Sequence, residues 1–424
     1  CMRVLVIGGG GREHALAWKL RQSPRVSEVI CAPGNGGICA DATCLPVDLR
    51  SVEAMLALTT KLQPDLTVIG PELPLTLGVV DEFTKRGLRV FGPTQAAARL
   101  ESSKSFAKQF MQRHNIPTAH FAVCNSQAGI KDALGLFHPP VVVKADGLAA
   151  GKGVVIAHSK DEAALVAGEM LSGKMLGEAG AQVVFEECLQ GEELSFLVIS
   201  DGRRFAPLVA AQDHKRIGEG DTGANTGGMG AYSAPELLDD KMREWLLTHV
   251  ARPTIEGMRT EGTEYRGILY CGLMMTARGP MVLEYNCRFG DPETQPILMR
   301  MESDLAEALE ASIEGRVSEG DFKWSQDASA CVVIASGGYP GTYETGKAIR
   351  GLEGTAEVED VKVFHAGTTR SDGVYTTSGG RVLGVTARAA DLKKALARCY
   401  EAAGKISFDG MYYRTDIGVK ALKR

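Results

Sequence analysis

Long apolar runs, basic blocks and paired cysteines are all missing from this 424-residue sequence. No apolar run approaches the roughly 18–20 residues that a membrane-spanning helix needs, and strand-like residues begin at Met2 without the layout of a signal peptide. No stripe of Lys and Arg occurs, and the net charge is −5, which argues against nucleic acid or an anionic membrane as the main partner. We therefore expect a cytoplasmic protein that binds neither.

Cysteine and proline patterns argue against other classes. The ten cysteines are scattered and form no Cys-x-x-Cys pair, so reduced, buried thiols are expected. The closest pair, Cys39 and Cys44, has no second Cys or His pair nearby, which makes a zinc site a weak alternative. With 17 prolines and no Gly-X-Y period, the chain is neither collagen-like nor a linker, and its length predicts two to four globular domains of roughly 100–200 residues.

Glycine, by contrast, is abundant: 50 residues, about 12% of the chain, against a usual share of about 7%. The first cluster, Gly8–Gly11, lies between a predicted strand (4–7) and a predicted helix (12–21), a context in which glycines bring a phosphate to a helix N-terminus. The dinucleotide fingerprint is incomplete, because Glu13 or His14 stands at the third glycine position. An NAD-dependent dehydrogenase is therefore an alternative that only this loop supports, beside a smaller phosphate site or plain tight turns.

Short β-branched runs alternate with helical stretches over the first hundred residues, which predicts a parallel sheet. Turn residues follow two strand ends, at 70–72 and 92–94, where open α/β sheets place ligand groups. The glycine-rich residues 214–233 are expected to form a long irregular loop. Other predicted elements are the helices 102–113, 302–316 and 390–403 and the strands 29–32, 66–69, 89–91, 141–144, 153–156, 183–186, 269–276, 281–285, 331–335, 362–364 and 381–386.

The second glycine cluster follows a lysine at the end of a strand. Lys144 closes the apolar run 141–143, and the residues up to Gly153 predict a glycine hairpin instead of the strand–loop–helix of a P-loop. Backbone N–H groups and lysines on such a hairpin can close over a triphosphate. A plain turn is the alternative, but a buried strand-end lysine needs a charged partner, which favours phosphate binding.

Acidic and amide residues gather at two further strand ends. Glu186 and Glu187 precede a linker and Glu193, where backbone groups can meet an adenine edge and a carboxylate can bind ribose hydroxyls, although acidic turns are common. Strand alternation places Glu284 and Asn286 on one face. One carboxylate and one amide, together with nucleotide phosphates, are typical ligands of Mg²⁺, so these two residues predict a metal site.

These motifs together resemble those of ATP-grasp enzymes: the lysine before a glycine hairpin, the acidic segment 186–193 and the Glu-x-Asn strand at 284–286. More narrowly, the octet 288–295 (Arg-Phe-Gly-Asp-Pro-Glu-Thr-Gln) resembles the signature of the phosphoribosylamine–glycine ligase family, also called glycinamide ribonucleotide synthetases. The resemblance covers essentially the whole chain from Met2. Further matching segments lie at 8–14, 70–72, 212–215, 225–230 and 412–418.

The resemblance implies an α/β fold, α+β overall, with ATP-grasp architecture. Four segments are expected along the chain. They are a Rossmann-like parallel-sheet domain at 2–102, a two-lobed ATP-grasp domain at 103–296 with a lid at about 121–187, a helical linker at 297–327 and a small mixed α/β domain at 328–424.

The family's reaction, by the same resemblance, joins glycine to phosphoribosylamine with ATP and Mg²⁺ or Mn²⁺ in purine biosynthesis. The glycine carboxylate would attack the γ-phosphate, and the ribosylamine would then attack the acyl carbon of glycyl phosphate. A carboxylate is a poor acyl donor until phosphate becomes its leaving group; cations spread the transferring charge, and a lid excludes water from the acyl phosphate. We expect a monomer or a weak homodimer.

Individual residues take roles by the same resemblance. ATP is expected to contact Lys104, Lys144, Gly151, Gly153, Glu186, Glu187, Leu189 and Glu193. The phosphoribosylamine and glycine sites are expected to involve Gly9, Gly10, Asn35, Pro71, Glu72, Asp213, Lys215, Pro292 and Glu293. Catalysis is expected to use Arg288, Asp213 and Asp291, with Arg288 stabilising the acyl phosphate. One dominant metal ion is expected on Glu284 and Asn286, because the preceding strand 269–275 carries no acid.

Three alternatives remain open. Another ATP-grasp ligase or carboxylase with a different acceptor is disfavoured by the octet and by the whole-length match. An NAD-dependent dehydrogenase depends on the first glycine loop alone. A non-catalytic nucleotide sensor leaves the Glu-x-Asn strand and Arg288 without a role.

Overall fold

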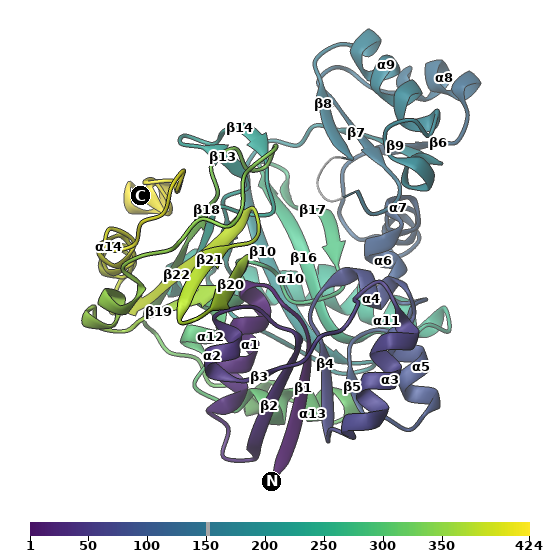
Figure 1. The fold of residues 1–424 in the computed structure, drawn as a ribbon. Helices are drawn as coiled ribbons and strands as arrows, with labels where there is room; N and C mark the ends of the chain where they lie inside the picture. The colour runs from purple at the N-terminus through teal and green to yellow at the C-terminus, as the bar shows by residue number, and fades with distance from the viewer. Residues whose placement is uncertain (150–152) are drawn as a thin grey trace.

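The first hundred residues form a five-stranded parallel sheet with the strand order β3-β2-β1-β4-β5, as their alternating pattern predicts (Figure 1). The computed structural model describes residues 1–149 and 153–424. Because the strands are parallel, the turns that follow β1, β2 and β4 meet at one edge of the sheet. The elements are β1 (Met2–Gly8), α1 (Gly11–Arg21), β2 (Val26–Pro33), α2 (Ile38–Asp41), β3 (Thr43–Cys44), α3 (Val52–Leu62), β4 (Leu66–Ile69), α4 (Glu72–Thr76), α5 (Val79–Lys85) and β5 (Val90–Phe91).

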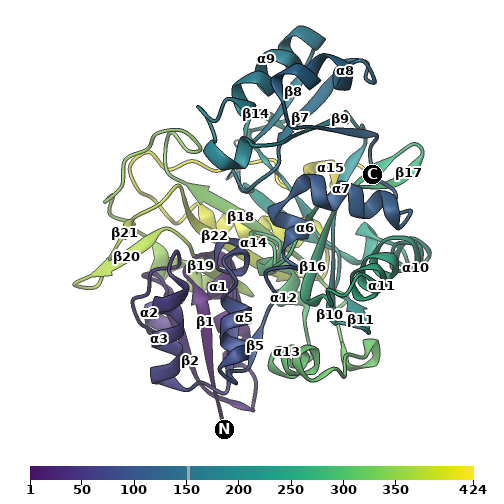
Figure 2. The same cartoon turned by 90° about the vertical axis from the view of Figure 1, so that its right-hand side faces the viewer.

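The lid is a four-stranded antiparallel sheet, order β6-β9-β7-β8, that projects from the rest of the molecule (Figures 1 and 2). The hairpin predicted around the second glycine cluster is confirmed, with Val141 paired to Ala157 and Lys144 paired to Val154. The lid has an apolar core of its own, built from residues between 124 and 185. The elements from the end of the first domain through the lid are α6 (Arg99–Ser102), α7 (Lys104–Arg113), β6 (Phe121–Cys124), η1 (Gln127–Gly129), α8 (Ile130–Leu134), β7 (Val141–Ala145), β8 (Val154–Ala157), α9 (Lys160–Leu171), η2 (Gly177–Gly180) and β9 (Val183–Glu187).

A second antiparallel sheet, order β11-β10-β16-β17, carries the predicted metal strand. The hairpin predicted around 278–280 is confirmed as β16 and β17, both longer than predicted. Side chains of this sheet and of the N-terminal sheet share one apolar core, so the two sheets pack as one body. No helix in the described residues combines the length and the apolar character needed to cross a bilayer. The elements are β10 (Glu192–Asp201), β11 (Phe205–Pro207), η3 (Pro235–Leu237), α10 (Asp240–Leu246), η4 (Leu247–Ala251), α11 (Arg252–Thr260), β16 (Arg266–Thr276) and β17 (Gly279–Asn286).

The C-terminal block forms a five-stranded antiparallel sheet, order β12-β15-β18-β22-β19, with α14 packed against β18 and β22. The prediction of an irregular loop over 214–233 is wrong, because this segment contains the hairpin of β13 and β14 and strand β15. Backbone pairing holds the hairpin while β14 stays exposed, so no apolar pattern marks it in the sequence. The elements are β12 (Gln212–Asp213), β13 (Arg216–Gly218), β14 (Thr222–Asn225), β15 (Gly230–Ser233), α12 (Thr294–Arg300), α13 (Leu305–Glu314), η5 (Glu319–Asp321), β18 (Ala328–Ala335), η6 (Leu352–Glu357), β19 (Val361–His365), β20 (Thr368–Ser371), β21 (Val374–Thr377), β22 (Arg381–Ala389), α14 (Leu392–Ala403) and α15 (Val419–Leu422).

Polar contacts join the N-terminal and C-terminal sheets. Asp41 Oδ2 lies 2.7 Å from His14 Nε2 and accepts a hydrogen bond from Lys362 Nζ at 2.9 Å. The backbone N–H of His365 donates to His14 Nδ1 at 2.8 Å. Gly37 packs against the His365 ring so closely that a Cβ at this position would lie 2.1 Å from His365 Cγ. The interface therefore requires glycine at residue 37.

Substitution of Gly37 by Ala should destabilise the protein by about 1–3 kcal/mol, because the added methyl group forces the His365 ring out of the interface. Gly320→Ala is the matched control, since the atom nearest to its Cβ would be Ser318 Oγ at 3.8 Å. Urea unfolding measures both variants. Equal stability of the two variants would show that His365 moves aside without a penalty.

Candidate active site

Four cationic side chains surround Glu284 on strand β17. Lys215 Nζ lies 3.6 Å from Glu284 Oε1, and Lys144, Lys104 and Arg288 act on the same carboxylate through their charges. Burial alone would raise the pKa of Glu284, but these cations outweigh it and lower the pKa to about 2. Four cations thus act on one ionised carboxylate, an arrangement that suits a polyphosphate carrying a metal ion.

Backbone carbonyls hold Lys104 and Lys144 beside this strand. Lys104 is the first residue of α7, and its Nζ donates to Gly147 O at 3.1 Å. Lys144 is the penultimate residue of the largely buried strand β7; its Nζ donates to Leu283 O at 3.3 Å and pairs with Glu186. Burial lowers the pKa of Lys104, and Lys144 lowers it further against the opposing effect of Glu284. The structure therefore brings together the two lysines predicted to bind phosphate.

The two acidic residues at the end of β9 face different partners. Glu186 is 2% exposed and pairs with lysines, so its side chain belongs to the phosphate end of the cleft. Glu187 accepts a hydrogen bond from His120 N at 2.9 Å and another from Arg278 Nη2 at 3.1 Å. Both carboxylates thus join the lid to the body of the protein, and contact with adenine through this segment stays a prediction.

Three of the other predicted nucleotide residues lie in the described part of the chain. Glu193 Oε2 is 3.7 Å from Lys215 Nζ, and Leu189 is partly exposed in the linker between β9 and β10. Gly153 O accepts a hydrogen bond of 2.7 Å that closes the β7–β8 hairpin. Gly151 lies outside the described residues.

Arg288 lies between two carboxylates from the N-terminal part of the chain. Its Nε donates to Glu72 Oε2 at 3.2 Å, and its Nη2 is 3.3 Å from Glu101 Oε2. Burial would lower the pKa of Arg288, but Glu101 and Glu72 raise it above its ordinary value. Glu72 opens α4 directly after Pro71. Glu101 was missed by the sequence analysis: it accepts a hydrogen bond from Cys287 N at 2.8 Å, and no motif marks its short helix.

A glycine-lined corner of the cleft holds two carboxyl groups with raised pKa values, Asp213 and Glu293. Burial is the largest cause for each, and Glu293 raises the pKa of Asp213 further, while Lys215 opposes the shift of both. Asp213 Oδ1 is buried without a hydrogen-bond partner among the described residues. A Cβ on Gly228 would lie 2.4 Å from Pro292 Cδ and 2.8 Å from Asp213 Oδ1. Asp213 Oδ1 is therefore a buried polar atom without a partner in the described residues, and Gly228 packs tightly beside it.

Asp291 connects the octet 288–295 to both terminal domains. Its Oδ1 accepts a hydrogen bond from Gln295 Nε2 at 2.8 Å, and its Oδ2 lies 3.5 Å from Arg12 N and 3.7 Å from Arg381 Nη2. Arg12 Nη1 also donates to Phe289 O at 3.1 Å. The contacts observed for Asp291 are thus contacts between domains, and its catalytic role stays a prediction.

Glu13 fills the first glycine loop. Gly10 N donates to Glu13 Oε1 at 2.9 Å, and a Cβ on Gly8 would lie 2.5 Å from Glu13 Cγ. Gly9 packs against Gly34, where a Cβ would lie 2.5 Å from the carbonyl oxygen. A carboxylate at the start of α1 stands where the pyrophosphate of a dinucleotide would bind and would repel it. The dehydrogenase interpretation is therefore not supported.

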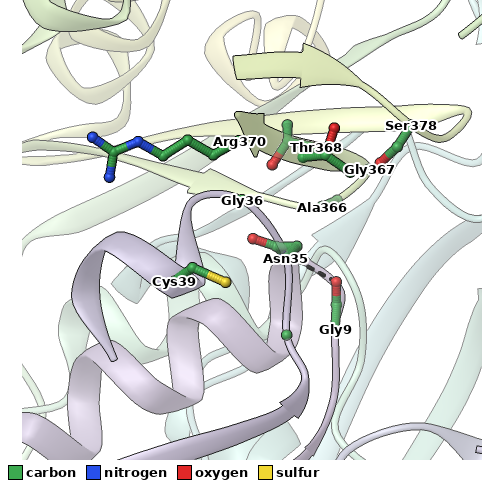
Figure 3. A pocket seen from close by; sticks show the side chains of 11 residues that line it. Gly9, Asn35, Gly36, Cys39, Ala366, Gly367, Thr368, Arg370 and Ser378 are labelled. Atoms are coloured by element: carbon green, nitrogen blue, oxygen red, sulfur yellow. Dashed lines mark hydrogen bonds between the residues drawn. The ribbon is translucent and has the colours of Figure 1, made fainter. Parts of the chain in front are cut away.

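A pocket of about 470 Å³ lies between the glycine turns of the N-terminal domain and strand β20 (Figure 3). Gly9 and Asn35 line its N-terminal side, and Asn35 Nδ2 donates to Gly9 O at 2.9 Å and to His365 O at 2.7 Å. Its C-terminal side was missed by the sequence analysis, because residues more than 300 positions away supply it. They include Ala366, Gly367, Thr368, Arg370 and Ser378.

Glu284 and Asn286 form the candidate metal site. Asn286 Oδ1 lies 3.5 Å from Arg288 Nη2, and the residue opposite Glu284 in the strand register is Gly272, which has no side chain to contribute. Among the described residues, no group of three or more His, Cys, Asp or Glu side chains is placed to hold a metal ion. One carboxylate and one amide fit Mg²⁺ or Mn²⁺ when phosphate oxygens and water supply the other ligands.

A parallel-sheet domain, a projecting antiparallel lid and a lysine-rich cleft on a central sheet together define an ATP-grasp enzyme, as predicted. Three domains of one family match consecutive parts of the chain: the phosphoribosylglycinamide synthetase N domain at residues 2–101, its ATP-grasp (A) domain at 102–294 and its C domain at 329–420. The chain belongs to the phosphoribosylglycinamide synthetase family, whose members are ATP-dependent ligases.

Individual relatives agree with this assignment. The phosphoribosylamine–glycine ligases of Vibrio parahaemolyticus and Salmonella typhi are each 48% identical to the chain, over 100% of its length and 99% of their own. The crystal structure of the phosphoribosylamine–glycine ligase from Thermotoga maritima has a TM-score of 0.86 at 36% identity and covers 98% of this chain and 99% of its own. A biotin carboxylase from Campylobacter jejuni, at 17% identity, a TM-score of 0.75 and coverage of 100% and 95%, shares the fold.

Asp213→Asn should increase stability at neutral pH while it lowers activity. The folded-state pKa of Asp213 is raised above its unfolded value of about 4. Asp213 therefore adds its full contribution to the free energy of unfolding below about pH 4, and this contribution is lost as the pH rises through the folded-state pKa. The Asn variant has no carboxyl group to ionise, so its free energy of unfolding should exceed that of the wild type by an amount that grows as the pH rises above about 4. Urea unfolding across this range measures the trend. Asp240→Asn, at a side chain 95% exposed, is the control, and a pH-independent difference at Asp213 would contradict the prediction.

Proposed function

We propose that this chain joins glycine to 5-phosphoribosylamine at the expense of ATP and forms glycinamide ribonucleotide, ADP and phosphate in de novo purine biosynthesis. The observation that carries the proposal is the ring of cations around Glu284, next to the octet 288–295. The domain matches and the names of the relatives support the choice of substrates.

In the first half of the reaction, the glycine carboxylate attacks the γ-phosphate of ATP. We assign binding of the phosphates to Lys104 and Lys144, and Lys215 adds a third positive charge beside Glu284. Such charges stabilise a transferring phosphoryl group because they are already oriented before the reaction. Glu284 and Asn286 would hold the divalent cation, which would neutralise phosphate charge when bound. We retain a single dominant protein-held ion as a prediction, supported by Gly272 opposite Glu284.

In the second half, the amine of phosphoribosylamine attacks the acyl carbon of glycyl phosphate, and phosphate leaves. We assign stabilisation of the acyl phosphate to Arg288, which Glu72 and Glu101 keep charged and oriented. Asp213 and Glu293 are assigned to the glycine amino group, because a buried acceptor without a partner is suited to a small primary amine or ammonium.

The pocket between the two terminal domains is assigned to the phosphate end of phosphoribosylamine. It opens at the glycine turns beside the octet, and its lining includes one cation, Arg370, and no carboxylate among the described residues. The backbone of Gly9 and the hydroxyl groups of Thr368 and Ser378 add polar groups without negative charge. A phosphate monoester suits this combination better than a neutral sugar does.

Arg370→Ala should raise the KM for phosphoribosylamine by about tenfold, the loss expected for one charge-assisted contact of about 1.4 kcal/mol. The KM values for ATP and glycine should stay within twofold of the wild type, because Arg370 is distant in the fold from the cations around Glu284. Arg350→Ala, an exposed arginine of the same domain outside the pocket, is the control. An unchanged KM for phosphoribosylamine would contradict the assignment of the pocket.

The reaction itself is tested by substrate dependence. ADP should form at a significant rate only when glycine, phosphoribosylamine and a divalent cation are all present with ATP. Glycine labelled with ¹⁸O in its carboxylate should transfer one labelled oxygen to phosphate, because that oxygen bridges carbon and phosphorus in glycyl phosphate. ADP formation from ATP alone at the full rate, or phosphate without label, would refute the proposal.

Three finer assignments complete the proposal. We place the reaction in the cytoplasm, where ATP is supplied and where all ten cysteines can stay free, as the structure has them. We take Mg²⁺ or Mn²⁺ as the cation, as the two oxygen ligands favour. A monomer or weak homodimer stays our prediction for the oligomeric state, which analytical ultracentrifugation measures.

A further inference from the structure

Lys108 is a buried charge that the reaction described above does not use. It lies on α7 one turn beyond Lys104, yet it is only 3% exposed, whereas most lysines keep their charge in water. Burial of a charged amine is strongly unfavourable unless a partner compensates it. The contacts of its Nζ atom therefore indicate what Lys108 does.

Lys108 Nζ pairs with Oε1 of Glu186 and donates a hydrogen bond to Thr118 Oγ1 at 2.5 Å. The other carboxylate oxygen of Glu186, Oε2, pairs with Lys144. Thr118 Oγ1 in turn donates to Val282 O at 2.6 Å, on the strand that carries Glu284 two residues later. One buried carboxylate is thus shared between a lysine of the body and the phosphate lysine of the lid.

The charges of this trio decide how much positive charge Lys144 presents to a phosphate. With both lysines protonated, the trio carries a net charge of +1. Without Lys108, Glu186 would neutralise Lys144 alone, and the net charge beside the phosphates would fall to zero. Since the trio is buried, water screens this difference weakly. Burial lowers the pKa of Lys108 to about 8, Glu186 opposes that shift and Lys144 adds to it, so the three groups respond to one another's charge.

We infer that Lys108 is a positioning residue for ATP: it occupies one oxygen of Glu186 and thereby leaves the charge of Lys144 available to the triphosphate. Lys108 does not touch the nucleotide in this arrangement, because Glu186 lies between it and Lys144. The inference rests on the proposed function only in taking Lys144 as a ligand of the ATP phosphates. It requires no particular acceptor for the acyl group.

A charge-balanced pair of variants tests this inference. Lys108→Met removes the cation, and the double variant Lys108→Met/Glu186→Gln also removes the anion, so that Lys144 again carries an uncompensated charge. The measurements are the dissociation constants of the magnesium complex of a non-hydrolysable ATP analogue and of adenosine, by isothermal titration calorimetry of the full-length protein. Lys131→Met, at an exposed lysine on lid helix α8, is the matched control.

Lys108→Met should weaken binding of the analogue about tenfold or more, as expected for the loss of one buried charge near a polyphosphate. Adenosine has no phosphate, and its binding should change less than about twofold; the double variant should recover most of the lost analogue affinity. If Lys108→Met does not fold, Lys108→Gln, which keeps a donor for Thr118, takes its place.

Equal weakening of the analogue and of adenosine would overturn the inference, because it would mean that Lys108 only supports the lid or the adenine site. The absence of recovery in the double variant would also overturn it. Neither measurement uses glycine or phosphoribosylamine. A wrong acceptor in the proposed function would therefore appear in the ADP assay and leave these binding results unchanged.

Discussion

The repulsion among like charges in the cleft is the constraint on which the rest of the structure depends. Lys104, Lys144, Lys215 and Arg288 gather around one carboxylate, Glu284, although cations at such short range destabilise a folded chain. Each cation is therefore tied to a carbonyl or to a further carboxylate. The carboxylates are Glu186 of the lid, Glu193 of strand β10, and Glu72 and Glu101 of helices α4 and α6. A cation that is paired with a neighbouring carboxylate is held in one orientation and can still bind a polyphosphate.

The octet 288–295 connects this group of charges to the N-terminal and C-terminal domains. Arg288 faces the cleft, while Asp291, three residues later, meets the start of α1 and Arg381 of the C-terminal sheet. Phe289 adds a carbonyl contact with Arg12. A single short segment therefore links the cations around Glu284 to both terminal domains. This explains why so many polar residues are concentrated directly after a buried strand.

Sequence patterns identified the residues whose role follows from their position on a strand. Lys144 ends an apolar run, and Glu284 and Asn286 alternate on one strand; the structure has these residues on strands β7 and β17, and their roles stay predictions. The parallel sheet and both predicted hairpins followed from the same rules. The octet identified the family. The hydrogen bonds and ion pairs inside the site could not be predicted from the sequence.

The residues that the sequence did not reveal owe their roles to contacts between segments that are far apart in the sequence. Glu101 acquires its importance only because residue 287 donates a hydrogen bond to it, and Arg370 only because β20 folds against the first glycine turns. No local pattern encodes either contact. The prediction for the 214–233 segment was wrong for a related reason. Backbone pairing holds its strands together, and their sequence has too few apolar side chains to show a strand pattern. Glu186 was placed correctly on a strand end, but its lysine partners come from other elements.

The separate apolar core of the lid has a mechanical consequence. In the part of the chain that the structure describes, that core contains only lid residues, so a rotation of the lid relative to the body would not have to open it. The contacts at its base described above are largely polar, including those of Glu186, Glu187 and Lys144. Polar contacts of this kind can exchange partners with water during rotation. The lid and the body thus have separate apolar cores joined by polar contacts, which is the arrangement of two units that can move about a hinge.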